Sequence, residues 1–197
     1  MSRRAKPAVK IVAGRWKGRV LEGPGSARPT SGRAREALFS ILHDSVQGAT
    51  VLDLYAGTGA LGLEAVSRGA RRAVLIEEDA SALERNAALL DPEERQVRVL
   101  RADAVRALSA LATAAERFDL VFADPPYADQ LPEGLVEGAA ALLAPGGLLI
   151  LQRDSPSSTP PEPPGVALVE RRRYGRNVFL FFARAGSSLD LCAPEDL

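Results

Sequence analysis

The sequence predicts an α/β fold with a seven-stranded, mostly parallel sheet, an antiparallel last strand and a basic β-hairpin ahead of it. Short apolar runs of strand length alternate along the chain with segments of helical periodicity, which is the pattern of a parallel sheet covered by helices. A glycine-rich loop follows the first of these runs, as in nucleotide-binding folds. The last two runs follow each other without a helix between them, which indicates a closing hairpin.

Length and composition limit the classes of protein to consider. The chain has 197 residues, the length of a single domain, and its formal net charge is zero. No apolar stretch reaches the ~18 residues of a membrane span or resembles a signal peptide, so we expect a cytoplasmic protein. The single Cys192 excludes a disulfide framework and a cysteine-based metal site. Zero net charge taken alone argues against a polyanionic partner.

Positive charge is nevertheless concentrated at the N-terminus. Residues 1–35 hold ten Lys or Arg against one acid, which leaves −9 on the rest of the chain. A basic arm on an acidic body indicates contact with a nucleic acid, although residues 1–6 read as a solubilising tail. From Val9 the arm alternates as a short hairpin turned near Ala13 and Gly14, and Trp16 either packs on the body or stacks on a base. The residues expected to contact RNA are Lys10, Arg15, Trp16, Lys17 and Arg19.

The remaining elements follow in order. Strands are expected at residues 50–55, 73–76, 96–100, 118–123 and 148–152, and helices at 33–44, 60–68, 80–90, 104–111 and 131–143. Asp79 is expected to cap the helix at 80–90, and Pro145-Gly146-Gly147 to follow the helix at 131–143. The closing hairpin pairs 166–170 with 177–183 through a basic turn at 171–176. Residues 155–165, with five prolines, read as a surface excursion of no assigned role.

The first strand end predicts the class of ligand. Gly57, Gly59 and Gly62 fit the G-x-G-x-x-G pattern between a strand and a helix. A dinucleotide fold aims that helix at a pyrophosphate, which the carboxylate of Asp53 would repel, so an acid here suits a cationic ligand. Glu77, at the next strand end, is placed to bind two ribose hydroxyls. A ribose and a cation together point to S-adenosylmethionine.

Two further strand ends carry acids. Asp103 either accepts a hydrogen bond from an adenine amino group or caps the helix that follows it. The tetrapeptide Asp124-Pro125-Pro126-Tyr127 ends a buried strand, since two prolines remove backbone donors and force an extended path. Its carboxylate and carbonyl oxygens could accept the hydrogens of an amino group while Tyr127 stacks on the ring, which suits a planar nucleobase. The alternative is a proline turn with a solvated aspartate.

These motifs resemble a known family. The run from Asp53 to Gly59, with Glu77, Asp103 and Asp124 to Tyr127, resembles Rossmann-like class I S-adenosylmethionine-dependent methyltransferases that act on amino groups. Residues 10–18 and 28–39 resemble the N-terminal signatures of the RsmD family, which methylates the N2 amino group of a guanine in 16S rRNA; Lys10 stands where the family usually has Arg. The resemblance spans about residues 10–184. It implies cofactor contacts from Arg28, Pro29, Thr30, Asp53, Tyr55, Gly57, Gly59, Glu77, Asp103 and Ala104, and target-base contacts from Asp124, Pro125 and Tyr127.

The resulting hypothesis is an rRNA (guanine-N2-)-methyltransferase with a basic arm at 1–27, a methyltransferase domain at 28–184 and a tail at 185–197. Its expected substrate is 16S rRNA, in the small ribosomal subunit or an assembly intermediate. We expect a monomer that needs neither a metal nor a membrane. The alternatives are an adenine or cytosine amino-methyltransferase acting on DNA, a nicotinamide oxidoreductase, and a non-catalytic RNA-binding module of the same fold.

Overall fold

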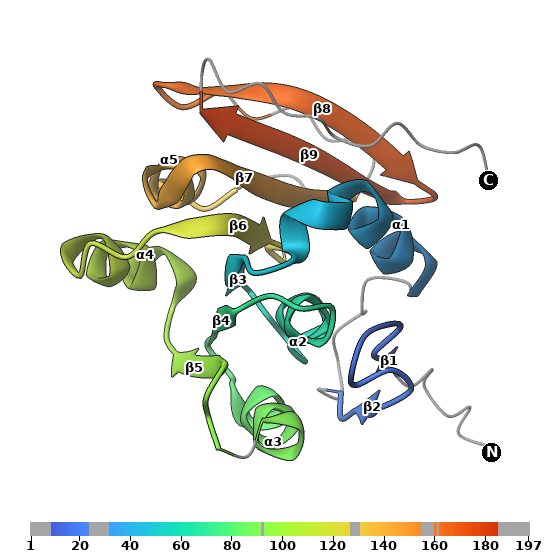
Figure 1. Ribbon diagram of the computed structural model, residues 1–197. Coiled ribbons are helices and arrows are strands. Elements are labelled where there is room, and N and C mark those ends of the chain that lie inside the picture. Colours follow the sequence, from blue (N-terminus) through green and yellow to red (C-terminus); the bar gives the residue numbers. More distant parts are fainter. Residues whose placement is uncertain are drawn as a thin grey trace, which may run out of the picture.

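The computed structural model describes residues 9–23, 32–91, 93–126, 131–154, 160 and 162–184. Within these residues the chain forms a seven-stranded sheet with helices on both faces, and a two-stranded hairpin beside it (Figure 1). The predicted fold class is therefore confirmed. No helix in this described part is long and apolar enough to cross a membrane.

The sheet has the strand order β5-β4-β3-β6-β7-β9-β8. Its parallel strands are β3 (Thr50–Leu54), β4 (Arg72–Glu77), β5 (Val97–Arg101), β6 (Phe118–Ala123) and β7 (Leu143–Asp154). The closing strand β9 (Asn177–Arg184) runs antiparallel to β7, and β8 (Val166–Tyr174) runs antiparallel to β9. It follows that β8 runs in the direction of β7, and Figure 1 shows the arrowheads of β6 and β8 pointing the same way.

Helices cover the two faces of the sheet with separate apolar clusters. One face carries α1 (Gly32–Leu42), the short 3-10 helix η1 (His43–Val46), α2 (Ala60–Ser67) and α3 (Ser81–Leu90). The other carries α4 (Ala104–Thr113) and α5 (Leu135–Ala141). In β3, Val51 joins the first cluster while Leu52 and Leu54 join the second. Because both faces are covered, the central strands are apolar throughout rather than alternating.

The N-terminal arm forms the expected hairpin and packs on the body. Strand β1 (Val9–Lys10) pairs antiparallel with β2 (Val20–Leu21), and Val9, Ile11 and Leu21 are buried in the first cluster. The turn is longer than predicted. Ile11 and Arg19 are still joined by a backbone hydrogen bond of 2.9 Å, so the connection runs through residues 12–18 instead of turning near Ala13 and Gly14.

Several predicted boundaries are wrong where tertiary contacts override a local signal. Helix α5 ends at Ala141, and Pro145 to Gly147 lie inside β7, whose ladder with β6 shifts register between Phe118 and Leu120 to accommodate them. Arg171 to Tyr174 belong to β8 because β9 supplies backbone partners for them, so the turn contains only Gly175 and Arg176.

The predicted helix cap at Asp79 is also misplaced by one residue. Ala80 occupies the N-cap position of α3, with no hydrogen bond from its own side chain. Asp79 still contributes there, since its Oδ1 accepts a hydrogen bond of 2.9 Å from Ser81 Oγ in the first turn.

Candidate active site

The carboxyl ends of four neighbouring strands bring the predicted acids to one edge of the sheet. Beyond the strands the chain stays tied together, since Ala56 N donates to Ile76 O at 3.0 Å and Ala102 N donates to Glu77 O at 3.2 Å. On the other side Asp124 N donates to Leu54 O at 3.4 Å. Parallel strands end at the same edge, so this convergence follows from topology. The acids gathered there are Asp53, Glu77, Asp103 and Asp124.

Asp53 is buried in β3 beneath the glycine loop. Its side chain is 2% exposed, and its Oδ2 accepts a hydrogen bond of 2.8 Å from Gly62 N in the first turn of α2. The pKa of Asp53 is raised to about 7, chiefly by burial; the Gly62 hydrogen bond opposes this shift, and the charges of Asp124 and Glu77 add to it. Since the N-cap Gly59 has no side chain, Asp53 satisfies one of the helix's open amides instead.

The glycine loop is held by Glu77 and by close packing. Gly57 N donates a hydrogen bond of 2.8 Å to Glu77 Oε2, and Glu78 N donates to Glu77 Oε1 at 3.0 Å. Gly59 has a φ of +82°, and a Cβ there would lie 2.6 Å from Leu83 Cδ1. Conformation and packing therefore require a glycine at 59 whatever the loop binds.

Asp103 caps α4, as the alternative interpretation proposed. Its Oδ1 accepts a hydrogen bond of 2.9 Å from Arg106 N, and its backbone is extended, as an N-cap requires. A cap uses one carboxylate oxygen, so a ligand contact through the second oxygen stays a prediction. Ala104, the first residue of α4, is buried.

Tyr55 begins the glycine loop in an unusual conformation. Its φ of +60° lies in the left-handed region, which is rare for a bulky side chain and collects at functional sites. Burial raises the pKa of the Tyr55 hydroxyl, and the charges of Asp103 and Glu77 raise it further. Tyr55 therefore lies among the strand-end acids, and its contact with the cofactor stays a prediction.

The tetrapeptide after β6 is described in part. Asp124 is half-buried, Pro125 is buried and Pro126 is exposed. The structure places Asp124 immediately after the strand, at the edge shared with Glu77. Four predicted contact residues lie outside the described residues: Arg28, Pro29, Thr30 and Tyr127.

The turn of the arm, with the predicted RNA-contacting residues Arg15 and Trp16, lies at the far end of α2 from this edge. Lys10, Lys17 and Arg19 are exposed, as is Arg15, whose backbone N donates to Ser67 O at 2.9 Å in the last turn of α2. An eight-residue helix is about 12 Å long, so the arm's turn and the glycine loop sit at its opposite ends.

Trp16 fits the packing interpretation rather than base stacking. It is half-buried against the first apolar cluster, and its backbone N donates to Ser67 Oγ at 2.9 Å. The Arg15 guanidinium carbon lies 4.2 Å from the centre of its ring. Its ring face is thus occupied by a cation of the same arm.

The structure reveals an anchor that the sequence interpretation missed. Glu64 in α2 is fully buried and accepts hydrogen bonds from Val12 N at 2.7 Å, Ala13 N at 2.9 Å and Arg68 Nε at 2.8 Å. Its partner on the other side is Arg35, whose Nε lies 3.7 Å from Glu64 Oε2. The available signal was a lone carboxylate in the otherwise apolar helix 60–67.

Arg35 belongs to the same anchor and not to the RNA-facing charge of the arm. Its side chain is 2% exposed and donates a hydrogen bond to Lys10 O. Burial lowers the pKa of Arg35, while Glu64 opposes that shift. An arginine remains charged under these conditions, so the pair is a buried ion pair that ties α1, α2 and the arm together.

Asn86 makes a second attachment, near the glycine loop. Its Oδ1 accepts from Glu22 N at 2.9 Å, and its Nδ2 donates to Glu22 O and to Thr58 O, both at 2.9 Å. The arm therefore runs along α2 from Ser67 at one end to Thr58 at the other.

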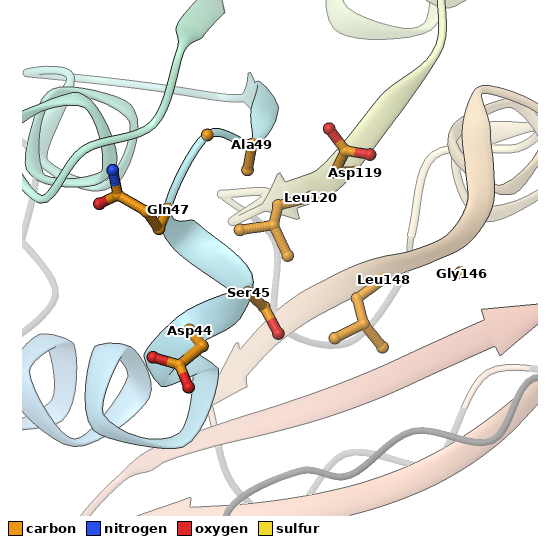
Figure 2. A pocket seen from close by; sticks show the side chains of 9 residues that line it. Asp44, Ser45, Gln47, Ala49, Asp119, Leu120, Gly146 and Leu148 are labelled. Atoms are coloured by element: carbon orange, nitrogen blue, oxygen red, sulfur yellow. The ribbon is translucent and has the colours of Figure 1, made fainter.

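A separate hollow opens at the opposite edge of the sheet. Figure 2 shows this cavity of about 350 Å³ between η1 and the first residues of β6, with Asp44, Ser45 and Asp119 among its lining side chains. Asp119 is already engaged, because its Oδ2 accepts hydrogen bonds from Thr50 N and Thr50 Oγ1, both at 2.7 Å. None of the predicted site residues lines the cavity. Among the residues that the structure describes, no group of three or more His, Cys, Asp or Glu side chains could hold a metal ion.

Comparison with known proteins places this arrangement in context. The sequence model of the family described as "Conserved hypothetical protein 95" matches residues 9–183. The chain is similar to ribosomal RNA small subunit methyltransferase D of Escherichia coli, at 34% identity over 187 residues, covering 89% of this chain and 90% of that protein. The protein of the same name from Haemophilus influenzae is 34% identical over 166 residues, covering 79% and 85%. The solved structure of yhhF from Escherichia coli has a TM-score of 0.76 at 34% identity and covers 90% of this chain and 98% of that chain.

Proposed function

The chain belongs to the conserved hypothetical protein 95 family, which includes ribosomal RNA small subunit methyltransferase D, and we propose that it methylates small-subunit ribosomal RNA using S-adenosylmethionine. Membership of the RsmD family, expected from the sequence motifs, is confirmed. The finer part of the proposal is the target, the N2 amino group of one guanine.

The observation that carries this proposal is the set of acids at four neighbouring strand ends. The raised pKa of Asp53 indicates that the protein itself does not fully compensate a negative charge at this edge. A cationic sulfonium would supply that compensation, whereas a pyrophosphate would add to the repulsion. The residues present therefore fit S-adenosylmethionine better than a dinucleotide, and the oxidoreductase alternative leaves Asp53 and Asp124 without a role.

Each residue of the edge has a proposed task. Glu77, which already accepts hydrogen bonds from the glycine loop, would bind the two ribose hydroxyls, and Asp103 would accept from the adenine amino group. Asp53 would hold the start of α2 and provide negative charge on the cofactor side of the edge. Tyr55, Gly57, Gly59 and Ala104 would shape the pocket. Arg28, Pro29 and Thr30 would cover the methionine end, as the resemblance implies.

Catalysis would depend on positioning the target amino group. When bound, S-adenosylmethionine supplies an electrophilic methyl group. The Asp124 carboxylate and the Pro125 carbonyl would accept the amino hydrogens while Tyr127 stacks on the base. Holding two reactants in line can contribute ~7–11 kcal/mol, and a carboxylate beside the nitrogen stabilises the positive charge that develops on it.

The substrate form and location remain predictions. We propose 16S rRNA in the small subunit or an assembly intermediate as the substrate, and a monomeric enzyme without a metal. The cytoplasmic location expected from the sequence is consistent with a ribosomal substrate.

The decisive experiment is transfer of a labelled methyl group to hypomethylated small subunits, followed by mapping of the labelled nucleotide. We expect label on the N2 of one guanine. Label on adenine or cytosine in a DNA substrate would instead support the DNA methyltransferase alternative, and RNA binding without transfer would support the non-catalytic module. Asp124→Ala is the control, because it should bind S-adenosylmethionine normally and lose ~2.7–4 kcal/mol of transition-state stabilisation. Wild-type turnover in that variant would remove Asp124 from the mechanism.

A further inference from the structure

The second concentration of positive charge in the molecule lies at the end of β8 and in the connection to β9; residues 171–176 are called the β8–β9 turn below. Residues 166–184 contain five arginines and one glutamate. Within six residues, Arg171, Arg173 and Arg176 are exposed, and none forms an ion pair with a carboxylate among the described residues. The glutamate, Glu170, is paired with Arg172 at 3.2 Å.

The topology of the sheet carries this turn to the edge of the candidate site. Because β8 runs in the direction of β7, its last residue lies at the same edge as the carboxyl ends of β3, β4 and β6. The register shows this directly, since Asp154 at the end of β7 and Tyr174 at the end of β8 both pair with Asn177. Figure 1 shows the turn beside α1, at the end of the sheet to which β6 points.

That edge needs positive charge if it is to receive a polyanion. Four acids lie on it, and their field would repel an RNA backbone. In the arm, the predicted RNA-contacting residue Arg15 lies at the last turn of α2, about 12 Å along the helix from the glycine loop. The arm's turn and the β8–β9 turn therefore offer positive charge on different sides of the acids.

The turn is also held rigidly enough to act as a fixed surface. Asn177 Oδ1 accepts a hydrogen bond of 3.3 Å from Gln152 Nε2, and the Tyr174 ring packs on Phe179 with 6.2 Å between ring centres. Arg173 Nε donates to Gly175 O at 3.1 Å, which limits the freedom of that side chain. Preorganised cations lose less entropy when they bind phosphates.

We propose that Arg171, Arg173 and Arg176 form an RNA-backbone contact surface that flanks the site and holds the strand on either side of the target nucleotide. This surface rests on the proposed function for its biological substrate, but its chemistry, arginine to phosphate, is independent of which base is methylated.

The test is the salt dependence of RNA binding by the full chain. The triple variant Arg171→Gln, Arg173→Gln, Arg176→Gln should bind a small-subunit rRNA transcript about tenfold or more weakly near 100 mM salt. The slope of log affinity against log salt should fall by about 2–3, at ~0.7–0.9 for each phosphate that the variant no longer neutralises. Affinity for S-adenosylmethionine should be unchanged by calorimetry.

Two further variants separate charge from structure. Replacing the same three residues by lysine should restore most of the slope, because lysine keeps the charge. The single variant Arg176→Gln changes a residue outside both strands, so it guards against misfolding of the triple variant, and it should lower the slope by about 0.7–0.9.

A matched control lies at the opposite edge of the sheet. Arg71, Arg95 and Arg117 are exposed and precede β4, β5 and β6, so their change to glutamine alters net charge equally at the wrong edge. That control should bind RNA as the wild type does. A wild-type salt slope in the Arg171, Arg173, Arg176 variant, or an equally weakened affinity in the control, overturns the proposal.

The outcomes also distinguish this proposal from the proposed function. If the wild type fails to methylate small-subunit rRNA but its binding to polyuridine depends on the turn, the proposed function fails and the surface stands. If methylation occurs and the slope is insensitive to the turn, only the surface fails. Normal RNA binding combined with weakened binding to assembled subunits would assign the turn to a ribosomal protein and reject the RNA contact.

Discussion

The N-terminal arm is attached to the body by side chains, whereas the basic β8–β9 turn is attached by the main-chain ladder of the sheet. The backbone of the arm donates hydrogen bonds to the side chains of Glu64, Ser67 and Asn86, which lie more than fifty positions away in the sequence. The turn is instead continuous with β8 and β9, which pair along their length. A single substitution at an anchor should therefore loosen the arm, while side-chain changes in the turn should alter its charge and leave its position unchanged.

The largest decrease in stability is expected when the Glu64 anchor of the arm is removed. Glu64→Ala leaves the buried Arg35 without its ion-pair partner and removes the acceptor of two arm amides, so the free energy of unfolding should fall by ~3–5 kcal/mol. Chemical denaturation measures this decrease, and hydrogen exchange should show reduced protection in residues 9–23. The matched control is Glu170→Ala beside the turn, where the ion pair with Arg172 is partly exposed and should contribute no more than about 1 kcal/mol. Equal decreases in the free energy of unfolding of the two variants would contradict the difference in attachment between the arm and the turn.

The second prediction concerns the acidic edge, which the β8–β9 turn flanks. The folded-state pKa of Asp53, about 7, lies above its ordinary value of 3.8, so between those values the folded protein holds a proton that the unfolded chain has released. This contribution to stability is present at low pH and is lost as the pH rises through about 7. The shift from 3.8 to about 7 corresponds to roughly 4 kcal/mol of stability, at about 1.36 kcal/mol for each pKa unit.

Asp53→Asn isolates that contribution, because it keeps an oxygen for Gly62 N and removes the titration. Urea denaturation at pH 5 and pH 8 should show that wild-type stability declines more steeply with rising pH than the stability of the variant. Parallel pH profiles for the two proteins would mean that Asp53 ionises normally in the folded state.

The third prediction uses two glycines of the arm. Gly14 has a φ of +78°, and a Cβ there would lie 1.8 Å from Ser67 O, so Gly14→Ala must push the arm away from α2. Gly18 has a φ of +84° with nothing within 4 Å, so Gly18→Ala adds only backbone strain of ~1–2 kcal/mol. Denaturation and proteolysis of the arm should therefore show clearly larger effects for Gly14→Ala. Similar effects would mean that the close approach to Ser67 does not hold the arm.

The last prediction tests whether the arm and the β8–β9 turn contribute independently to RNA binding. Neutralising Lys10, Arg15, Lys17 and Arg19 should reduce the salt slope of RNA binding by about 3–4, in keeping with ~0.7–0.9 for each phosphate. Combining these changes with the three glutamines in the turn should give the sum of the separate free-energy changes within ~0.5 kcal/mol, because the two surfaces do not touch. A clearly smaller combined change would indicate that arm and turn bind the same phosphates.

Local sequence patterns identified most helices and strands of the fold. The wrongly predicted boundaries share one cause. The strands and helices were recognised because apolar periodicity reports which residues must be buried. The stop expected at Pro145-Gly146-Gly147 and the turn expected at Arg171 to Tyr174 were overridden by backbone pairing with β6 and β9. A neighbouring strand supplies backbone hydrogen bonds that the secondary-structure propensities of single residues do not take into account. The residues at which a strand or helix ends therefore depend on partners that are distant in the sequence.

By itself, the sequence determined that Asp53, Glu77, Asp103 and Asp124 would share one edge, because the carboxyl ends of parallel strands meet there whatever the details of packing. Only the tertiary structure decided that Glu64 anchors the arm, that Arg35 is buried, and that the arm's turn lies at the far end of α2 from the acids. It also decided that the arginines at 171–176 lie at the same edge of the sheet as these acids, since the direction of β8 depends on how β9 inserts between β7 and β8. Such placements arise from contacts between distant segments, and these leave no periodic signal in the sequence.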